Sequence, residues 1–375
     1  MWKKGLKRCI CNVNSLILKR FALKKIKFGK RFIGGDESSY IVAEMSANHC
    51  GSFDKAVQII HQAKKSGADA VKLQTFKPDS ITLNCDHPDF LLPANNQWKN
   101  HSTRYSLYQE AYTPWEWHAD LIAEGKKIEI DVFSSPFDIE AVDFLESLDV
   151  IALKIASPEI TDIPLLKRVG KTGKPVILST GTAELNDINL AVDTLRSVHC
   201  DDIVILKCTS LYPTPAEDVH LKTILNLAET FDCVSGISDH TEGIGIPVAA
   251  TVIGGKMIEK HFMLDEEDSS VDAFFSLSPN EFSRMVEEVR KVELAVGKVQ
   301  YDLPAGLKKQ MKKKQRSLYA AEDIKKNTPI NQLNCRSVRP GNGLHPKHYE
   351  TILGRIAKRD IKKGEPLDWN MIQDS

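Results

Sequence analysis

The sequence predicts an α/β protein, a (β/α)8 TIM barrel followed by a small C-terminal domain. From Ser38 to Gly297, short β-branched runs alternate strictly with longer stretches of helical periodicity. Strands that alternate with helices form parallel βαβ units with right-handed crossovers. The runs number eight, which closes a barrel, and no G-x-G-x-x-G follows the first, as it usually does in an open doubly wound sheet.

The runs of β-branched residues define the strands of the predicted barrel. The helices between them are amphipathic, as in Phe53–Ser66, Phe137–Leu148 and Pro279–Val296, where apolar residues recur at helical spacing. The expected strands are Tyr40–Glu44, Ala70–Gln74, Ile128–Ser134, Ile151–Ala156, Pro175–Thr180, Asp202–Cys208, Val234–Ser238 and Met257–His261. The catalytic domain predicted in this way covers residues 36–297.

The composition changes beyond Gly297. Residues 308–316 carry six basic groups without an apolar periodicity, so residues 298–316 are interpreted as a linker. Residues 317–375 contain a near-repeat, because 320–330 and 357–367 share A-x-x-D-I-K-K-x-x-P-(I/L). Halves of about 30 residues are too small to fold separately, so we expect them to interlock around one core. Its expected strands are Ser317–Ala320 and Arg355–Arg359.

The overall composition excludes several classes of protein. Fifty Lys and Arg balance fifty Asp and Glu, which gives no charge argument for nucleic acid or a membrane surface as partner. The longest uncharged apolar stretch, 243–255, is shorter than the roughly 20 residues that span a bilayer. Eight cysteines are scattered without C-x-x-C spacing, which fits a reducing cytoplasm better than a zinc ribbon or a disulfide scaffold.

The first 35 residues hold eleven Lys and Arg and no Asp or Glu. They contain a single Ser and no clear signal-peptide apolar region with a cleavage site. We interpret residues 1–35 as a solvated basic extension, or as the result of a start codon assigned too far upstream, and expect them to lie outside the fold.

Polar residues end every expected strand, at the face where TIM barrels place their active sites. His240 and His261 end the seventh and eighth strands, which are neighbours in a barrel, so both imidazoles can face one point. Two His with oxygen donors suit Mn²⁺, Co²⁺, Zn²⁺ or Mg²⁺. Asp239 and Glu259 are candidates to orient the imidazoles. The alternative is that one or both His are satisfied core residues.

A second predicted cluster is cationic and rich in hydroxyl groups. Lys72 and Lys154 end the second and fourth strands, and the hydroxyls around the same rim come from Ser135, Ser157, Ser179 and Ser238. Such a set favours a cradle for a phosphate and a carboxylate, with both lysines charged. The alternatives are ordinary ion pairs or a Schiff-base lysine, which needs a desolvated site.

Glu44 ends the first strand beside Asn48 and His49. Its carboxylate could bind a sugar hydroxyl or act as a general base, or it could make a structural hydrogen bond. Trp115 and Trp117 are interpreted as packing residues, and Cys50 and Cys208 have no evident base partner in the sequence.

The strand-end motifs together resemble the sialic-acid synthase family. They are 42–51 (VAEMSANHCG), 71–75 (VKLQT), 133–138 (FSSPFD), 153–164 (LKIASPEITDIP), 178–181 (LSTG), 206–213 (LKCTSLYP), 236–241 (GISDHT) and 258–262 (IEKHF). Segment 336–346 resembles the antifreeze-like (SAF) domain of that family. The M-S-A-N-H at 45–49 is similar to the pseudaminic acid synthase branch.

The resemblance implies a condensation of phosphoenolpyruvate with an open-chain 2,4-diacetamido-2,4,6-trideoxy-altrose, releasing phosphate. It implies that His240 and His261 ligate a divalent metal (Mn²⁺, Mg²⁺ or Co²⁺), with Glu259 and Asp272 holding metal-bound waters. It places phosphoenolpyruvate on the lysines and serines of the second cluster. The sugar would contact Glu44, Gln74 and Tyr212, and we add Glu159 and Ser210 to the substrate-binding set. Arg339 would reach the active site of the partner subunit in a domain-swapped homodimer.

Two departures from the family pattern concern the site. Cys50 stands where Asn or Glu is usual, and Ser269-Ser270-Val271-Asp272 replaces Gly-Gly-Pro-Asp, so we expect the loop that holds Asp272 to be shifted. N-acetylneuraminate synthase and legionaminate synthase are alternatives on the same scaffold. A Schiff-base aldolase and a non-catalytic binding protein are alternatives of other classes, and the latter leaves the polar strand ends unexplained.

Overall fold

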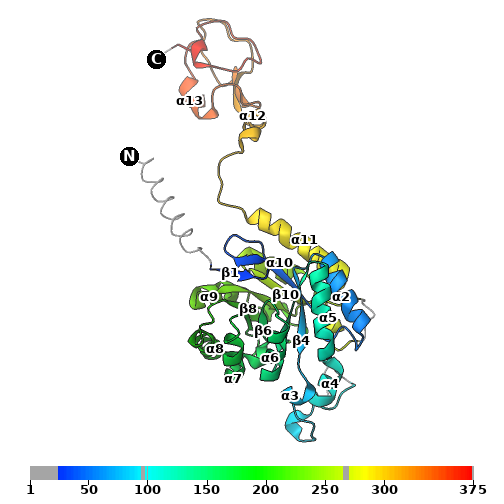
Figure 1. Cartoon of the computed structure of the whole chain (residues 1–375). Helices are drawn as coiled ribbons and strands as arrows, with labels where there is room; N and C mark the ends of the chain where they lie inside the picture. Colours follow the sequence, from blue (N-terminus) through cyan, green and yellow to red (C-terminus); the bar gives the residue numbers. More distant parts are fainter. Residues whose placement is uncertain (1–23, 94–97, 99, 265–269, 374–375) are drawn as a thin grey trace. The chain divides into compact units, whose positions relative to one another are not determined.

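The computed structural model describes residues 24–93, 98, 100–264 and 270–373. The chain divides after Gly297 into two compact units. The first unit is a closed barrel in which β10 pairs with β3, so the predicted fold is confirmed (Figure 1). Its parallel strands are β3 (Tyr40–Glu44), β4 (Ala70–Thr75), β5 (Asp131–Pro136), β6 (Leu153–Ile155), β7 (Val176–Ser179), β8 (Ile203–Cys208), β9 (Val234–Asp239) and β10 (Met257–His261).

Helices surround the barrel, and most follow the strand that the alternation assigns to them. They are α2 (Phe53–Lys65), α5 (His118–Lys127), α6 (Ile139–Ser147), α7 (Ile163–Gly170), α8 (Leu185–Ser197), α9 (Lys222–Phe231), α10 (Gly245–Ile253) and α11 (Pro279–Val296). Ser52, Asp138 and Asp162 cap their helices by accepting hydrogen bonds from backbone N–H groups. Two further helices, α3 (Pro78–Ile81) and α4 (Arg104–Ala111), lie between β4 and α5 and extend beyond one end of the barrel (Figure 1).

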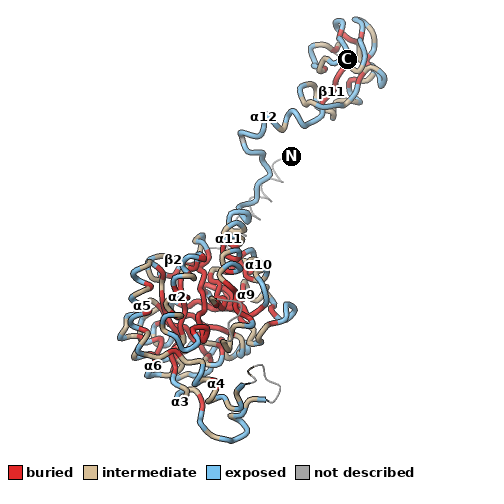
Figure 2. Tube along the Cα trace, turned by 90° about the vertical axis from the view of Figure 1, so that its right-hand side faces the viewer, coloured by how far each residue is buried: buried red, intermediate tan, exposed pale blue. Residues whose placement is uncertain are grey.

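Buried residues, red in Figure 2, lie on the barrel strands and on the inner sides of the helices around them. The expected strand at Ile128–Ser134 begins three residues later, at Asp131. The reason is that α5 ends in a turn in which Glu129 takes a left-handed conformation, with φ of 60°.

A β-hairpin that the sequence analysis missed closes the amino-terminal end of the barrel. Its strands are β1 (Lys25–Phe28) and β2 (Arg31–Gly34), which pair antiparallel. Phe28 is fully buried and makes edge-to-face contacts with Tyr40 and Phe133, at ring-centroid distances of 4.9 and 5.8 Å. The expectation that residues 1–35 lie outside the fold is therefore wrong for residues 24–35, while residues 1–23 lie outside the described residues.

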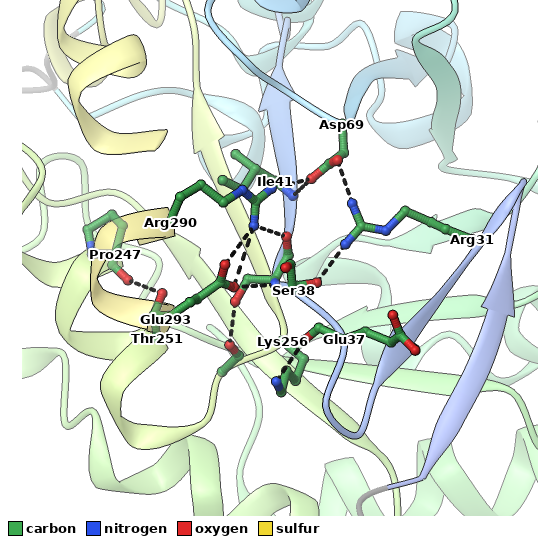
Figure 3. Close-up of polar contacts among 12 residues, drawn as sticks. Arg31, Glu37, Ser38, Ile41, Asp69, Pro247, Thr251, Lys256, Arg290 and Glu293 are labelled. Carbon is green, nitrogen blue, oxygen red and sulfur yellow. Dashed lines mark hydrogen bonds and ion pairs between the residues drawn. The ribbon is translucent and has the colours of Figure 1, made fainter. Parts of the chain in front are cut away.

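Asp69 ties the hairpin to the barrel (Figure 3). Its carboxylate lies 2.6 Å from Arg31 Nη1 on β2 and 3.1 Å from Arg290 Nη2 on α11. The same carboxylate accepts a hydrogen bond from the backbone N–H of Ile41 on β3 at 2.8 Å. One partly exposed carboxylate thus connects three elements that are distant in the sequence, at the end of the barrel opposite the predicted site.

The second unit contains the near-repeat, and its two copies interlock as expected. Ile324 and Ile361, which are equivalent positions, exchange two backbone hydrogen bonds of 2.8 Å. The equivalent Asp323 and Asp360 each cap the other copy, by accepting from the N–H groups of Lys363 and Lys326. Both isoleucines belong to the single buried core of this unit.

Other expectations for this unit are wrong in detail. β11 (Ser317–Ala320) is confirmed, but it pairs with β12 (Cys335–Val338), and the segment 355–359 forms only isolated bridges. The expected linker contains helix α12 (Ala305–Lys314), because its Lys, Gln, Leu and Met residues are good helix formers even without an apolar face. A short helix, α13 (Tyr349–Ile352), also belongs here. Among the described helices of both units, none is long and apolar enough to cross a bilayer.

Candidate active site

The strand register brings the predicted residues to one end of the barrel. His261 lies opposite Glu44, Glu44 opposite Lys72, and Gln74 opposite Ser135 on successive strands. Because all strands are parallel, their carboxyl ends form one face, where TIM barrels carry their catalytic groups. The polar strand ends therefore meet, as the fold prediction required.

Lys72 and Lys154 are paired with buried carboxylates. Lys72 Nζ lies 2.7 Å from Glu44 Oε2 and 3.6 Å from Glu259 Oε1, and Lys154 Nζ lies 3.3 Å from the same Glu259 oxygen. All four residues are at most 5% exposed. Two lysines and two glutamates therefore form a buried quartet with no formal net charge, a feature the sequence analysis did not foresee.

Burial and charge act in opposite directions on the pKa values of the quartet. Burial raises the pKa of Glu44 more than Lys72 lowers it. Burial would also raise the pKa of Glu259, but Lys154 and Lys72 together lower it below its ordinary value. The pKa of Lys72 is raised, because Glu259 and Glu44 outweigh burial, whereas burial lowers the pKa of Lys154.

The predicted serines surround this quartet. Ser135 accepts a hydrogen bond of 3.2 Å from Lys72 Nζ, and Ser238 donates one of 3.1 Å to Glu259. The hydroxyls of Ser179 and Ser210 are buried and have no hydrogen-bond partner within the described chain. Ser157 Oγ accepts from the N–H of residue 181 at 2.9 Å. Two hydroxyls are thus available to a ligand.

Gly181 is a site residue that the sequence analysis quoted only within a motif. A Cβ at this position would lie 2.3 Å from Ser210 Oγ and 2.9 Å from Ser157 Oγ. Only glycine therefore leaves room for both hydroxyls to approach the backbone. Its signal in the sequence was a Gly directly after the polar end of a strand.

His240 and His261 face each other, with ring centroids 5.3 Å apart. His240 Nδ1 lies 3.1 Å from the carbonyl oxygen of Thr209, so Nδ1 donates and Nε2 is left to accept or coordinate. Burial and the neighbouring His240 hold the pKa of His261 well below its usual range. His261 Nδ1 is buried and has no hydrogen-bond partner among the described residues, so this ring is a neutral imidazole, the form that binds metals.

Cys208 has an imidazole neighbour that the sequence analysis did not identify. Its Sγ lies 3.8 Å from His240 Nδ1. Burial would raise the pKa of the thiol, but His240 lowers it to about 7. This partner was hidden because the two residues are on different strands. Trp115, by contrast, packs as expected, stacked on Phe144 at 4.8 Å.

The two carboxylates expected beside the imidazoles are used elsewhere. Asp239 pairs with Lys260 at 2.6 Å and accepts a hydrogen bond from the Thr241 hydroxyl, and Glu259 pairs with the lysines of the quartet. Asp272 does reach the site, where it accepts a hydrogen bond from Ser46 Oγ, and burial raises its pKa. The altered loop thus still presents the Asp272 carboxylate.

The residues present fit a two-imidazole metal site. The described part of the chain has no group of three or more His, Cys, Asp or Glu side chains arranged to hold a metal ion. Two facing imidazoles with an unpaired buried nitrogen can nevertheless supply two ligands and leave positions for substrate and water oxygens.

A cavity of about 420 Å³ lies over these strand ends. That volume is within the range of small-molecule sites. Side chains with polar groups in its lining are Ser46, Gln74, Trp98, Arg104, Tyr108, Glu159, Ser210, Tyr212, His261 and Asp272. Gln74 donates to Glu44 Oε1 at 2.9 Å, and burial raises the pKa of Glu159 to about 7 and that of Tyr212 above its usual range. The residues predicted from the sequence to contact the sugar thus line one cavity or contact its lining.

Two candidate residues at the end of β3, Asn48 and His49, do not line the cavity. Asn48 donates to the Phe262 carbonyl and to Ser276 Oγ, both at 2.9 Å, and His49 lies 3.2 Å from Thr113 Oγ1. Both therefore make structural contacts. Arg339 belongs to the second unit and is exposed there.

Comparisons with known proteins agree with this arrangement. The chain matches the NeuB family over residues 59–301 and the SAF domain over residues 315–373. It is 45% identical over 334 residues to a pseudaminic acid synthase of Campylobacter jejuni, covering 88% of this chain and 96% of that protein. A pseudaminic acid synthase of Helicobacter pylori is 40% identical over 338 residues, covering 89% and 98%. The N,N'-diacetyllegionaminic acid synthase of Campylobacter jejuni is 36% identical over 339 residues, covering 88% and 98%.

Among solved structures, the fold is similar to that of the spore coat polysaccharide biosynthesis protein SpsE of Bacillus subtilis. The TM-score is 0.64 at 32% sequence identity, and the match covers 94% of this chain and all of that one.

Proposed function

Because the chain belongs to the NeuB family, we propose that it condenses phosphoenolpyruvate with 2,4-diacetamido-2,4,6-trideoxy-altrose to give pseudaminic acid and phosphate. The observation that carries this assignment is the 45% identity, over 334 residues, to a pseudaminic acid synthase. The corresponding identity to a legionaminic acid synthase is 36%, and the legionaminate precursor is therefore the second candidate for the acceptor sugar. A Schiff-base aldolase is disfavoured, because both candidate lysines are ion-paired with buried carboxylates.

The lysine–serine cluster is the expected binding site for phosphoenolpyruvate. Lys72 and Lys154 supply positive charge, and the free hydroxyls of Ser179 and Ser210 supply donors without losing an existing hydrogen bond. Charge-assisted hydrogen bonds of this kind hold phosphate and carboxylate groups in a fixed orientation. Holding C3 of phosphoenolpyruvate against the sugar removes much of the entropic barrier to their reaction.

His240 and His261 would hold the divalent cation (Mn²⁺, Mg²⁺ or Co²⁺), which when bound supplies a Lewis acid for the sugar aldehyde. C3 of phosphoenolpyruvate forms a bond to the aldehyde carbon, and the aldehyde oxygen becomes a hydroxyl. Water adds to C2, and cleavage of the C2–O bond then releases phosphate and leaves the keto acid. Burial raises the pKa of Glu44. Its carboxyl would position the sugar or move a proton.

The assembly belongs to the same proposal. We place Arg339 in the active site of the partner subunit of a domain-swapped homodimer. Support comes from its exposure and from its side chain having no hydrogen-bond or ion-pair partner in residues 24–93, 98, 100–264 and 270–373. A cytoplasmic location fits the six cysteines of the described residues, all of which are free thiols.

Mass spectrometry of the product tests the acceptor. The full-length protein is incubated with phosphoenolpyruvate, Mn²⁺ and one of three sugars: the diacetamido-trideoxy-altrose, the legionaminate precursor or N-acetylmannosamine. We expect the nine-carbon product to form fastest from the altrose, and chelation to abolish it. Faster turnover of either other sugar would overturn the proposed acceptor, and turnover unchanged by chelation would overturn the metal.

A further inference from the structure

The cavity over the strand ends has two unlike sides. One is the polar set that includes Gln74, Glu159 and His261. The other is an apolar wall made of Phe76, Ile81, Leu107, Tyr108 and Phe137. Phe76 directly follows β4, Ile81 ends α3, Leu107 and Tyr108 lie on α4, and Phe137 directly follows β5. The wall therefore comes mainly from the extra helices between β4 and α5.

The wall is fixed by its own packing. Phe76 makes edge-to-face contacts with Phe137, at a ring-centroid distance of 5.2 Å, and with Tyr108, at 6.0 Å. Phe76 and Leu107 are almost fully buried. Thr103 caps α4 by accepting a hydrogen bond from the Ser106 N–H. Edge-to-face aromatic pairs hold their rings in a defined geometry, so this surface is already formed before a ligand binds.

We propose that this apolar wall determines acceptor specificity, by receiving the C6 methyl and an acetamido methyl of a 6-deoxy, di-N-acetylated sugar. The inference rests on the proposed function and goes further, because it assigns the recognition of the methyl groups to particular side chains. Among the five wall residues only the Tyr108 phenol could hydrogen-bond a C6 hydroxyl, and the guanidinium of Arg104, also on α4, lines the cavity as well. One methylene in an apolar pocket changes specificity by about 10- to 200-fold.

The position of the wall relative to the reacting groups supports the assignment. His261 and the end of β4 line the same cavity as the wall. A sugar whose aldehyde carbon lies near His261 must extend its remaining carbons away from the strand ends. The apolar residues on α3 and α4 are the surface that the far end of such a chain meets.

The test replaces Ile81, which is only half-buried, so that the fold is preserved. Ile81→Thr keeps the branched Cβ, removes the terminal methyl and adds a hydroxyl. Its matched control is Leu83→Thr, two residues further on, where the side chain is 59% exposed and does not line the cavity. We expect Ile81→Thr to raise KM for the trideoxy sugar about five- to tenfold with little change in kcat or in KM for phosphoenolpyruvate, since a methyl contact binds ground and transition states alike. Leu83→Thr should stay within twofold.

Saturation-transfer NMR on the wild-type protein provides a readout that does not depend on turnover. The C6 and acetamido methyls should receive more saturation than the ring protons, and less in Ile81→Thr. Equal saturation of methyl and ring protons would overturn the proposal.

The outcomes separate this inference from the proposed function. If the wild-type protein condenses only a sugar that carries a C6 hydroxyl, the proposed acceptor is wrong and the wall proposal falls with it. If the trideoxy sugar is the substrate but Ile81→Thr leaves its KM unchanged, the proposed function stands and only the role of the wall is refuted.

Discussion

Replacing Glu159 by Gln tests whether burial keeps this carboxyl protonated near neutral pH. Glu159 lies in the turn η3 (Ser157–Thr161) that follows β6. Its Oε2 is buried and has no hydrogen-bond partner in the described chain. Burial raises its pKa to about 7, and its own backbone N–H and Lys154 oppose this shift only in part.

The sign and size of the effect follow from linkage. In the unfolded chain the Glu159 carboxyl titrates near 4.5. Between that pH and about 7 the folded state binds a proton that the unfolded state does not, so stability falls as the pH rises and is constant above this window. A shift of about 2.5 pKa units corresponds to about 3 kcal/mol. Glu159→Gln removes the titration, so at pH 8 the variant should be more stable than the wild type by about 2–3 kcal/mol.

Urea unfolding of the full-length protein without ligands, followed by tryptophan fluorescence from pH 5 to 8.5, measures the difference. The gap between Glu159→Gln and wild type should open as the pH rises and close towards pH 4.5. Glu229→Gln, an exposed carboxyl on α9, is the matched control and should follow the wild type. Parallel stability curves for Glu159→Gln and wild type, or a variant less stable at pH 8, would refute the reasoning.

Three further predictions concern the metal, the dimer and a buried ion pair. His240→Ala and His261→Ala should each lose turnover and Mn²⁺ binding in calorimetry while keeping a wild-type circular dichroism spectrum; retained Mn²⁺ affinity would contradict the two-imidazole site. Co-expressed Arg339→Ala and His240→Ala chains should recover about a quarter of wild-type turnover, because half the dimers formed at random have one intact site; no recovery would argue against the swap. Lys260→Met leaves the buried Asp239 carboxylate without its cation and should lower the free energy of unfolding by about 3–5 kcal/mol. The double variant with Asp239→Asn should recover part of this loss. A loss below about 1 kcal/mol in urea unfolding would contradict the prediction.

The barrel could be predicted because both of its signals are local. Helical periodicity and β-branched runs are each contained in a window of a few residues, and polar strand ends follow directly from the parallel topology. The hairpin was missed although Lys25–Phe28 alternates charged and apolar residues. Its basic composition was taken as the sign of a solvated tail, and only the tertiary structure shows that Ile26 and Phe28 point inward.

The partners of the site residues could not be predicted, because they depend on register around the barrel. Glu259 was expected beside the imidazoles, since it is two residues from His261 in the sequence. Along a strand, residues two apart point to the same face, but the nearest cations to Glu259 come from β4 and β6. Sequence proximity therefore identified the right residues and assigned wrong neighbours to some of them.

The buried quartet changes the physical account of anion binding. Free lysines would attract phosphoenolpyruvate by net charge, but Lys72 and Lys154 are already neutralised by Glu44 and Glu259. An anion that takes a place beside Lys72 must therefore compete with the Glu44 carboxylate. Burial raises the pKa of Glu44 despite its ion pair with Lys72. A carboxyl displaced from its cation in a buried site is stabilised by taking up a proton. The same substrate that needs the positive charge of Lys72 would thus prepare Glu44 to carry a proton next to the sugar.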